Sequence, residues 1–202
     1  MPLPVSVAVE GQSDVAVVQR ILALVGCSVH AIYGRSGRAT IERSLPGYNN
    51  AAHFAPWLVL RDLDTDAPCA AELARRILPH PAEWMRFRIA VREVESWLLA
   101  DPERLSGYLR VSRTSIPHDP DSLADPKATL VNLARRSSAA SVRADMVPEL
   151  GVSAAVGPGY VSRVSEFAGN YWRPEVATLN SASLRKCIQR ARELRGYLDI
   201  ED

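Results

Sequence analysis

The sequence predicts an α/β protein, with a parallel sheet covered by helices on both faces and an α-helical C-terminal extension. In the first half of the 202 residues, short apolar runs alternate with amphipathic segments, a pattern typical of strand–helix–strand units. Prolines then punctuate the second half, where no further strand is predicted. A hydrophobic content of 47% is enough for a sizeable core.

The first strand-to-helix unit sets the pattern. An apolar run ends at Glu10, and the helix after it repeats apolar residues every three or four positions. Ser13 is its predicted N-cap, and Asp14 is placed to complement the dipole of its first turn. The predicted order is strand 5–10, helix 13–25, strand 27–33, strand 57–61, helix 70–78, strand 87–91 and short helix 97–100.

Residues 34–56 are predicted to be a long loop over the sheet edge. Gly34, Gly37 and Pro46 punctuate the segment, which is long for such a connection. Arg35 and Arg38, together with the glycine amides, suit contact with a nucleic-acid backbone, and a solvated loop is the plainer alternative.

The chain divides by pattern into an α/β domain, residues 1–101, and a helical extension packed on it, residues 102–202. Helices are predicted at 126–136 and 183–198. Trp97 is predicted to belong to the core. The sequence shows no internal repeat.

Composition excludes several classes of protein. The formal net charge of +1 does not decide whether nucleic acid binds. No apolar run approaches the roughly 18 residues needed to span a bilayer, and no charged leader precedes an apolar segment, so we expect a soluble, cytoplasmic protein. Cys27, Cys69 and Cys187 have no disulfide or metal spacing and are interpreted as buried or bystander thiols.

Acidic residues follow three of the predicted strands: Glu10, then Asp62 and Asp64, then Glu93 and Glu95. Ligands gather at the carboxyl ends of parallel strands, and a hard divalent cation prefers oxygen donors. If both pairs are extended, each places its two carboxylates on one side of the backbone. The sequence therefore predicts a Mg²⁺ or Mn²⁺ site at this edge.

Several neighbouring residues carry two interpretations. Asp66 is interpreted first as a helix cap and second as a ligand. Arg61 and Arg92 either neutralise the carboxylates or contact a phosphate. Lys127 stands at a predicted helix start, where a cation opposes the dipole, so phosphate contact and solvated surface are both open. Of the last acidic pair, Glu95 is favoured for the site.

These motifs resemble a known family. The block Val9-Glu10-Gly11-x-Ser13-Asp14 and the strand ending in Asp62-x-Asp64 resemble the Toprim domain of topoisomerases, primases and overcoming-lysogenization-defect nucleases. The block Arg61-Asp62-Leu63-Asp64 and residues 89–101 look more closely like a domain-of-unknown-function group of small bacterial Toprim-like proteins. The blocks Asp125-Pro126-Lys127 and Val156-Gly-Pro-Gly-Tyr160 look similar to that group but indicate no mechanism.

The resemblance implies a Mg²⁺-dependent nuclease that hydrolyses phosphodiesters in DNA or RNA. It implies acid–base work or metal ligation for Glu10 and Mg²⁺ binding for Asp62 and Asp64. Glu93 or Glu95 would complete a second metal site, since two cations about 4 Å apart stabilise both the attacking and the leaving oxygen. Substrate contacts are expected from Arg35, Arg61, Arg92 and Lys127.

Two other functions are weighed. A Toprim-like protein without turnover of its own could act as a regulatory or nucleic-acid-binding partner, within a bacterial defence system, with a partner ATPase or as a homo-oligomer. The run from Asp62 to Asp66 also resembles the nucleophile motif of haloacid-dehalogenase-like phosphatases, but two predicted strands precede it. Dinucleotide-binding, P-loop and nucleophile-elbow motifs are absent, and no organic cofactor is indicated.

Overall fold

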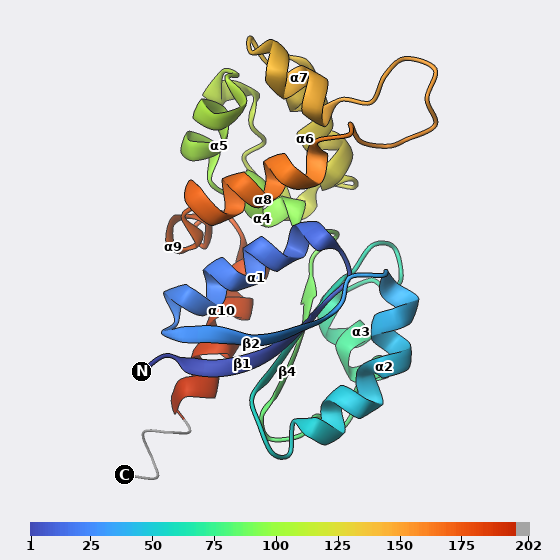
Figure 1. Cartoon of the computed structure of the whole chain (residues 1–202), viewed down its shortest axis with the longest axis vertical. Helices are drawn as coiled ribbons and strands as arrows, with labels where there is room; N and C mark the ends of the chain where they lie inside the picture. Colours follow the sequence, from blue (N-terminus) through green and yellow to red (C-terminus); the bar gives the residue numbers. More distant parts are fainter. Residues whose placement is uncertain (197–202) are drawn as a thin grey trace.

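Four parallel strands form the sheet at the centre of the α/β part (Figure 1). The order across the sheet is β2-β1-β3-β4, and Asp62 at the end of β3 lies beside Ala90 at the end of β4. The structure is a computed structural model that describes residues 1–196. The strands are β1 (Leu3–Val9), β2 (Cys27–Gly34), β3 (Trp57–Asp62) and β4 (Met85–Ala90).

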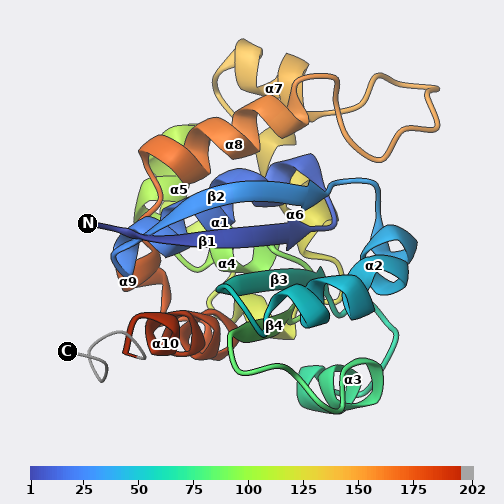
Figure 2. The ribbon, with the colours of Figure 1, turned by 60° about the horizontal axis from the view of Figure 1, so that its bottom comes forward.

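Helices cover both faces of this sheet (Figure 2). Because side chains alternate along a strand, Val5 and Val7 of β1 face one core and Ala8 faces the other. The first core contains α1 and α4, and the second contains α2 and α3. The predicted α/β class with helices on both faces is confirmed. These helices are α1 (Gln12–Leu24), α2 (Arg38–Ala51), α3 (Ala70–Ile77) and α4 (Glu95–Leu99).

Residues 102–196 contain helices and turns but no strand, as predicted. Their apolar residues join the core on the α1 side of the sheet, where Trp97 is fully buried as predicted and Trp172 Nε1 donates to its backbone oxygen. The proposed boundary at residue 101 stays a prediction. The helices are α5 (Pro102–Leu109), α6 (Pro126–Arg135), α7 (Ala140–Met146), α8 (Tyr160–Asn170), α9 (Pro174–Ala177) and α10 (Ala182–Gly196), with 3₁₀ turns at Arg113–Ser115 and Pro120–Ser122.

The prediction of a loop over residues 34–56 is wrong, because most of this segment is helix α2. Ile41 and Leu45, one helical turn apart, are buried against Ala8 and Val59 of the sheet. Pro46 lies inside the helix. Proline and glycine signals are local, and burial of this apolar stripe outweighs the helix-breaking tendency of Pro46.

The N-terminus of α1 also differs from the prediction. Gly11, not Ser13, is the N-cap, and Asp14 is the third helical residue, where its Oδ2 accepts a hydrogen bond of 2.8 Å from the Gly11 amide. A carboxylate at the third helical position that accepts from the N-cap amide satisfies one of the free backbone donors at the start of the helix. The end of the helix predicted at 183–198 lies outside the described residues.

Two other expectations concern thiols and membranes. Cys27 and Cys187 are buried, Cys69 is exposed, and all three are free thiols. Among residues 1–196, no helix is both long enough and apolar enough to cross a bilayer.

Gly34 gives a test of the fold next to the strand ends. Its φ is +79°, and a Cβ there would lie 2.4 Å from the Val9 carbonyl oxygen and 2.7 Å from Ile41 Cδ1. We expect Gly34→Ala to lower the free energy of unfolding by more than about 2 kcal/mol, measured in urea, because strain and overlap add. The control, Gly47→Ala inside α2, meets nothing within 4 Å and should stabilise by about 0.5–1 kcal/mol. Equal effects would contradict this explanation.

Candidate metal centre

Three strand ends bring carboxylates to one edge of the sheet. Glu10 follows β1, Asp62 ends β3, and Glu95 opens α4 just after β4. All three are withdrawn from solvent, since Asp62 is 9% exposed, Glu95 is 2% exposed and the Glu10 side chain is 14% exposed. Neighbouring parallel strands with matching ends produce this convergence, as the sequence predicts.

Glu10 has an unusual electrostatic environment. Burial raises the pKa of its carboxyl from 4.5 to about 7, and the charges of Asp64 and Asp14 add to this, while Arg61 opposes it. Its buried Oε1 accepts no hydrogen bond from any residue of 1–196. A buried oxygen without a donor is costly, and a cation would satisfy it.

Asp62 lies deeper among acids. Burial raises the pKa of its carboxyl well above the usual range, and the charges of Asp14, Glu95 and Glu10 raise it further. Its Oδ1 accepts a hydrogen bond of 3.1 Å from the Val94 amide. Buried like charges destabilise one another, so this group of carboxylates favours either protons or a cation.

Asp14 is a member of this cluster, although the sequence favoured a role at the helix dipole over metal binding for this residue. The structure confirms the helix-terminal role, but the side chain is buried, and its charge is the largest acidic influence on Asp62. Burial also raises the pKa of its own carboxyl. The sequence contains a signal for this position. Asp14 lies four residues after Glu10, so the first turn of the helix returns its side chain to the same edge of the sheet.

Lys127 has acidic partners, which explains a cation at a helix start. The Glu93 carboxylate accepts hydrogen bonds from the Lys127 amide (2.8 Å) and from its Nζ (2.9 Å), at the N-terminus of α6. Lys127 Nζ also lies 3.6 Å from Glu95 Oε1. Burial would lower the pKa of Lys127, but the charges of Glu95 and Glu93 outweigh it and raise that pKa. The ammonium therefore stays charged between the two glutamates.

The expectation of extended acidic pairs is wrong for both. Asp64 has φ +47°, and its side chain is 42% exposed, whereas Asp62 is buried. Arg92 has φ +61°, and Val94, just before α4, has φ −59° and ψ −28° rather than extended angles, so the second pair is not extended either. Arg92 Nη1 donates to the Asp64 backbone oxygen at 2.7 Å, which ties the two turns together. Alternation holds within a strand and fails where the strand turns.

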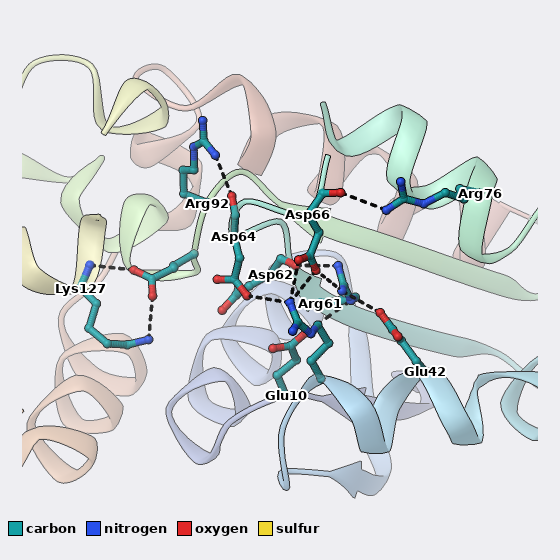
Figure 3. Close-up of polar contacts among 11 residues, drawn as sticks. Glu10, Glu42, Arg61, Asp62, Asp64, Asp66, Arg76, Arg92 and Lys127 are labelled. Atoms are coloured by element: carbon teal, nitrogen blue, oxygen red, sulfur yellow. Dashed lines mark hydrogen bonds and ion pairs between the residues drawn. The ribbon is translucent and has the colours of Figure 1, made fainter. Parts of the chain in front are cut away.

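Arg61 lies at the centre of an ion-pair network (Figure 3). The side chain is 2% exposed, and its Nη2 contacts Glu42 Oε1 at 2.7 Å and Asp66 Oδ2 at 2.5 Å. Its Nε lies 3.7 Å from Glu10 Oε1. Of the two interpretations of Arg61, this burial favours neutralisation of the carboxylates.

Asp66 is not a helix cap, which corrects the first interpretation of this residue. Helix α3 begins at Ala70 with Cys69 as N-cap, and the Asp66 carboxylate instead accepts hydrogen bonds from Arg61 and Arg38. Hydrogen bonds from these arginines lower its pKa. Arg38, interpreted from the sequence as a loop residue suited to a nucleic-acid backbone, instead reaches this network from the start of helix α2.

Arg35 and Arg92 lie near the strand ends that carry the cluster. Arg35 is exposed with φ +69°, and its guanidinium has no partner among residues 1–196. Arg92 is half-buried beside Asp64. Both are placed where a ligand approaching the acidic edge could meet them.

The donor set fits a hard divalent cation, although the ligands are not gathered into a finished site. Carboxylate oxygens are the ligands that Mg²⁺ and Mn²⁺ prefer, and Glu10 Oε1, which accepts no hydrogen bond from residues 1–196, lies among mutually repelling acids. Within residues 1–196, however, no three Asp, Glu, His or Cys side chains are arranged to hold one ion. Arg61 and Lys127 draw some of these carboxylates toward themselves.

The fold and the placement of the strand-end acids define an α/β protein with a parallel sheet, carboxylates at the carboxyl ends of its strands and a helical C-terminal region packed on it. Two solved structures are similar to nearly the whole chain. The C-terminal region of the Xanthomonas campestris pv. campestris OLD protein has a TM-score of 0.49 and 13% identity, covering 98% of this chain and 97% of that one. The C-terminal region of the Burkholderia pseudomallei OLD protein has a TM-score of 0.45 and 16% identity, covering 96% and 98%.

At these identities and TM-scores, the similarity says nothing about activity. No protein-family model matches the chain, and no curated protein matches it.

The role of Arg61 as a neutralising residue can be tested by its removal. We expect Arg61→Met to lower the free energy of unfolding by about 3 kcal/mol or more, because Glu10 and Asp66 would lose a buried partner. Arg43→Met, on the exposed face of α2, should change it by less than about 0.5 kcal/mol. Urea unfolding measures both. A stable Arg61→Met protein would show that Arg61 is free for another role.

Proposed function

We propose that this chain is a Mg²⁺- or Mn²⁺-dependent nuclease that hydrolyses phosphodiester bonds in DNA or RNA. One observation carries the proposal. Glu10, Asp62 and Glu95 are withdrawn from solvent together at the carboxyl ends of parallel strands, and burial raises the pKa of each carboxyl. Such perturbed acids gather at functional sites more often than at structural ones.

Each acidic residue has a separate role in this proposal. Divalent cations, when bound, would stabilise the charge that develops on the attacking and leaving oxygens. Asp62 and Asp64 would hold a cation, and Glu95 or Glu93 would hold a second. Glu10 would ligate metal or take a proton from the attacking water, and its pKa of about 7 suits proton transfer near neutral pH.

Basic residues around the acids would hold the substrate. Lys127 Nζ lies at the acidic edge and stays charged, so it could move from Glu93 to a phosphate oxygen. Arg35 and Arg92 lie at the same edge and would contact the backbone. Arg61, which the resemblance also implied as a contact, is proposed to neutralise the carboxylates instead.

Cleavage of supercoiled plasmid, linear DNA and single-stranded RNA by purified protein tests this proposal. With Mg²⁺ or Mn²⁺, we expect one substrate to be cut, and Glu10→Ala and Asp62→Ala to abolish cutting. Glu149→Ala, on the exposed loop after α7, is the control and should cut normally. Cutting that survives chelation, or survives both substitutions, would overturn the proposal.

A second candidate is a Toprim-like protein that acts only with a partner, as a regulatory or nucleic-acid-binding component of a bacterial defence system. The lysine between Glu93 and Glu95 favours it, because the ammonium occupies space between two proposed ligands. A partner ATPase or a second copy of the chain would then rearrange this edge. Absence of cleavage, together with retained metal binding, would support this candidate.

A further inference from the structure

The segment Val156-Gly-Pro-Gly-Tyr160, which the sequence analysis left without a mechanism, closes the protruding loop between α7 and α8 (Figure 1). The Gly157 amide donates to the Met146 carbonyl at 3.0 Å, and the Gly159 amide donates to the Asp145 carbonyl at 2.8 Å. A Cβ on Gly159 would lie 2.7 Å from the Asp145 Cβ. The glycines therefore allow the start of α8 to pack directly on the end of α7.

This packing fixes the first residue of α8. Tyr160 is 2% exposed and belongs to the core on the α1 side of the sheet. Its hydroxyl donates a hydrogen bond of 2.9 Å to Glu95 Oε1. The position of the hydroxyl is therefore set by the core rather than by a flexible surface chain.

Tyr160 and Lys127 contact the same oxygen of Glu95, at 2.9 Å and 3.6 Å. No other side-chain donor among residues 1–196 hydrogen-bonds this carboxylate. Glu95 also faces the like charge of Glu93 and lies near Asp62. Without the phenol, the carboxylate would be free to move toward the Lys127 ammonium and away from the other acids.

We propose that Tyr160 is a positioning residue, whose hydroxyl holds Glu95 Oε1 so that the second carboxylate oxygen stays available to a divalent cation beside Asp62. The inference rests on the proposed function, since Glu95 is its proposed second-metal ligand. Hydrogen bonds that orient a ligand commonly change metal affinity or activity by ten- to a hundredfold. Gly157 and Gly159 affect Glu95 only by fixing the position of Tyr160.

Tyr160→Phe tests this directly, because it removes only the hydroxyl. We expect Mn²⁺ affinity, measured by calorimetry, to fall about tenfold, and kcat for cleavage to fall about tenfold with KM unchanged. Tyr108→Phe is the matched control: its half-buried hydroxyl bonds Glu166, and neither quantity should change. Glu95→Gln combined with Tyr160→Phe should bind Mn²⁺ no more weakly than Glu95→Gln alone, because the phenol acts through Glu95.

A second pair of variants leaves the Tyr160 side chain itself unchanged. Gly159→Ala should displace Tyr160 and weaken Mn²⁺ binding, whereas Gly169→Ala near the other end of α8, where a Cβ meets nothing within 4 Å, should not. Circular dichroism confirms that each variant is folded.

The outcomes separate this inference from the proposed function. If Tyr160→Phe weakens Mn²⁺ binding and the wild type cuts no substrate, the positioning role of Tyr160 is supported and the proposed nuclease activity is overturned. If Tyr160→Phe binds Mn²⁺ like the wild type while Glu95→Gln binds it weakly, the positioning role is overturned whether or not the protein cuts. Additive losses in the double variant would also overturn it, and a wild type that binds no Mn²⁺ would overturn both proposals.

Discussion

Asp62→Asn is expected to abolish metal-dependent cleavage, by about 10³-fold or more, and at the same time to stabilise the protein in the presence of a chelator. The first effect follows because a lost ligand removes several kcal/mol of transition-state stabilisation. The second follows because burial and the charges of Asp14 and Glu95 raise the pKa of Asp62. A neutral asparagine removes that repulsion and keeps the oxygen that accepts from the Val94 amide.

The expected gain is about 1 kcal/mol or more in the free energy of unfolding, the lower end of the range for replacing buried charges. Asp101→Asn is the matched control. Asp101 is also buried, but it accepts hydrogen bonds from Arg173 Nε and Nη2 at 3.0 and 2.7 Å. Its replacement should cost at least about 1 kcal/mol. If both substitutions destabilise alike in urea with EDTA, Asp62 is a structural residue.

The stability of the chelated protein is expected to fall as pH rises from about 5 to about 8. The pKa of Glu10 is raised from 4.5 to about 7 by burial, so in this window the folded protein holds a proton that the unfolded chain has lost. Stability then decreases with pH, and the loss is complete above the folded pKa. Asp62, Asp14 and Glu95 have pKa values raised in the same direction.

The Glu10 shift corresponds to about 3 kcal/mol at 1.36 kcal/mol per unit, and partial solvent screening reduces this to about 2 kcal/mol. Mn²⁺ should reverse the trend, because ligands bind it in the ionised form and binding releases protons. Urea unfolding at pH 5, 6.5 and 8, with and without Mn²⁺, measures both effects, and Glu10→Gln should flatten the chelated profile. Stability that rises with pH under chelation would contradict the electrostatic account.

The sequence predicts the framework of the site better than its geometry. Apolar runs and strand-end acids are local patterns, so the sheet, α1 and the convergence of Glu10 with Asp62 follow from them. Helix α2 does not, because its glycine and proline signals are local while the burial of Ile41 depends on the finished sheet. Asp64 and Arg92 depart from the strands in left-handed turns that no pattern of residues announces.

Long-range partners are the other part that sequence reasoning misses. Lys127 meets Glu93 across 34 positions, and Tyr160 meets Glu95 across 65. Contacts between residues so far apart in the chain leave no periodic pattern in the sequence. The acidic edge could therefore be predicted, but the residues that hold its carboxylates in place could not. Asp66 shows the same limit, since its arginine partner Arg38 is 28 positions away.

Calorimetric titration of Mn²⁺ into the purified protein at pH 7.5, with Asp62→Asn and Glu10→Gln beside the wild type, tests the metal site most directly. The wild type is expected to bind Mn²⁺ and release protons, because carboxylates with raised pKa values give up protons when a cation binds. Both variants should bind at least about tenfold more weakly. Binding of equal strength in the wild type and Asp62→Asn, or no binding in the wild type, would contradict a metal centre at this edge of the sheet.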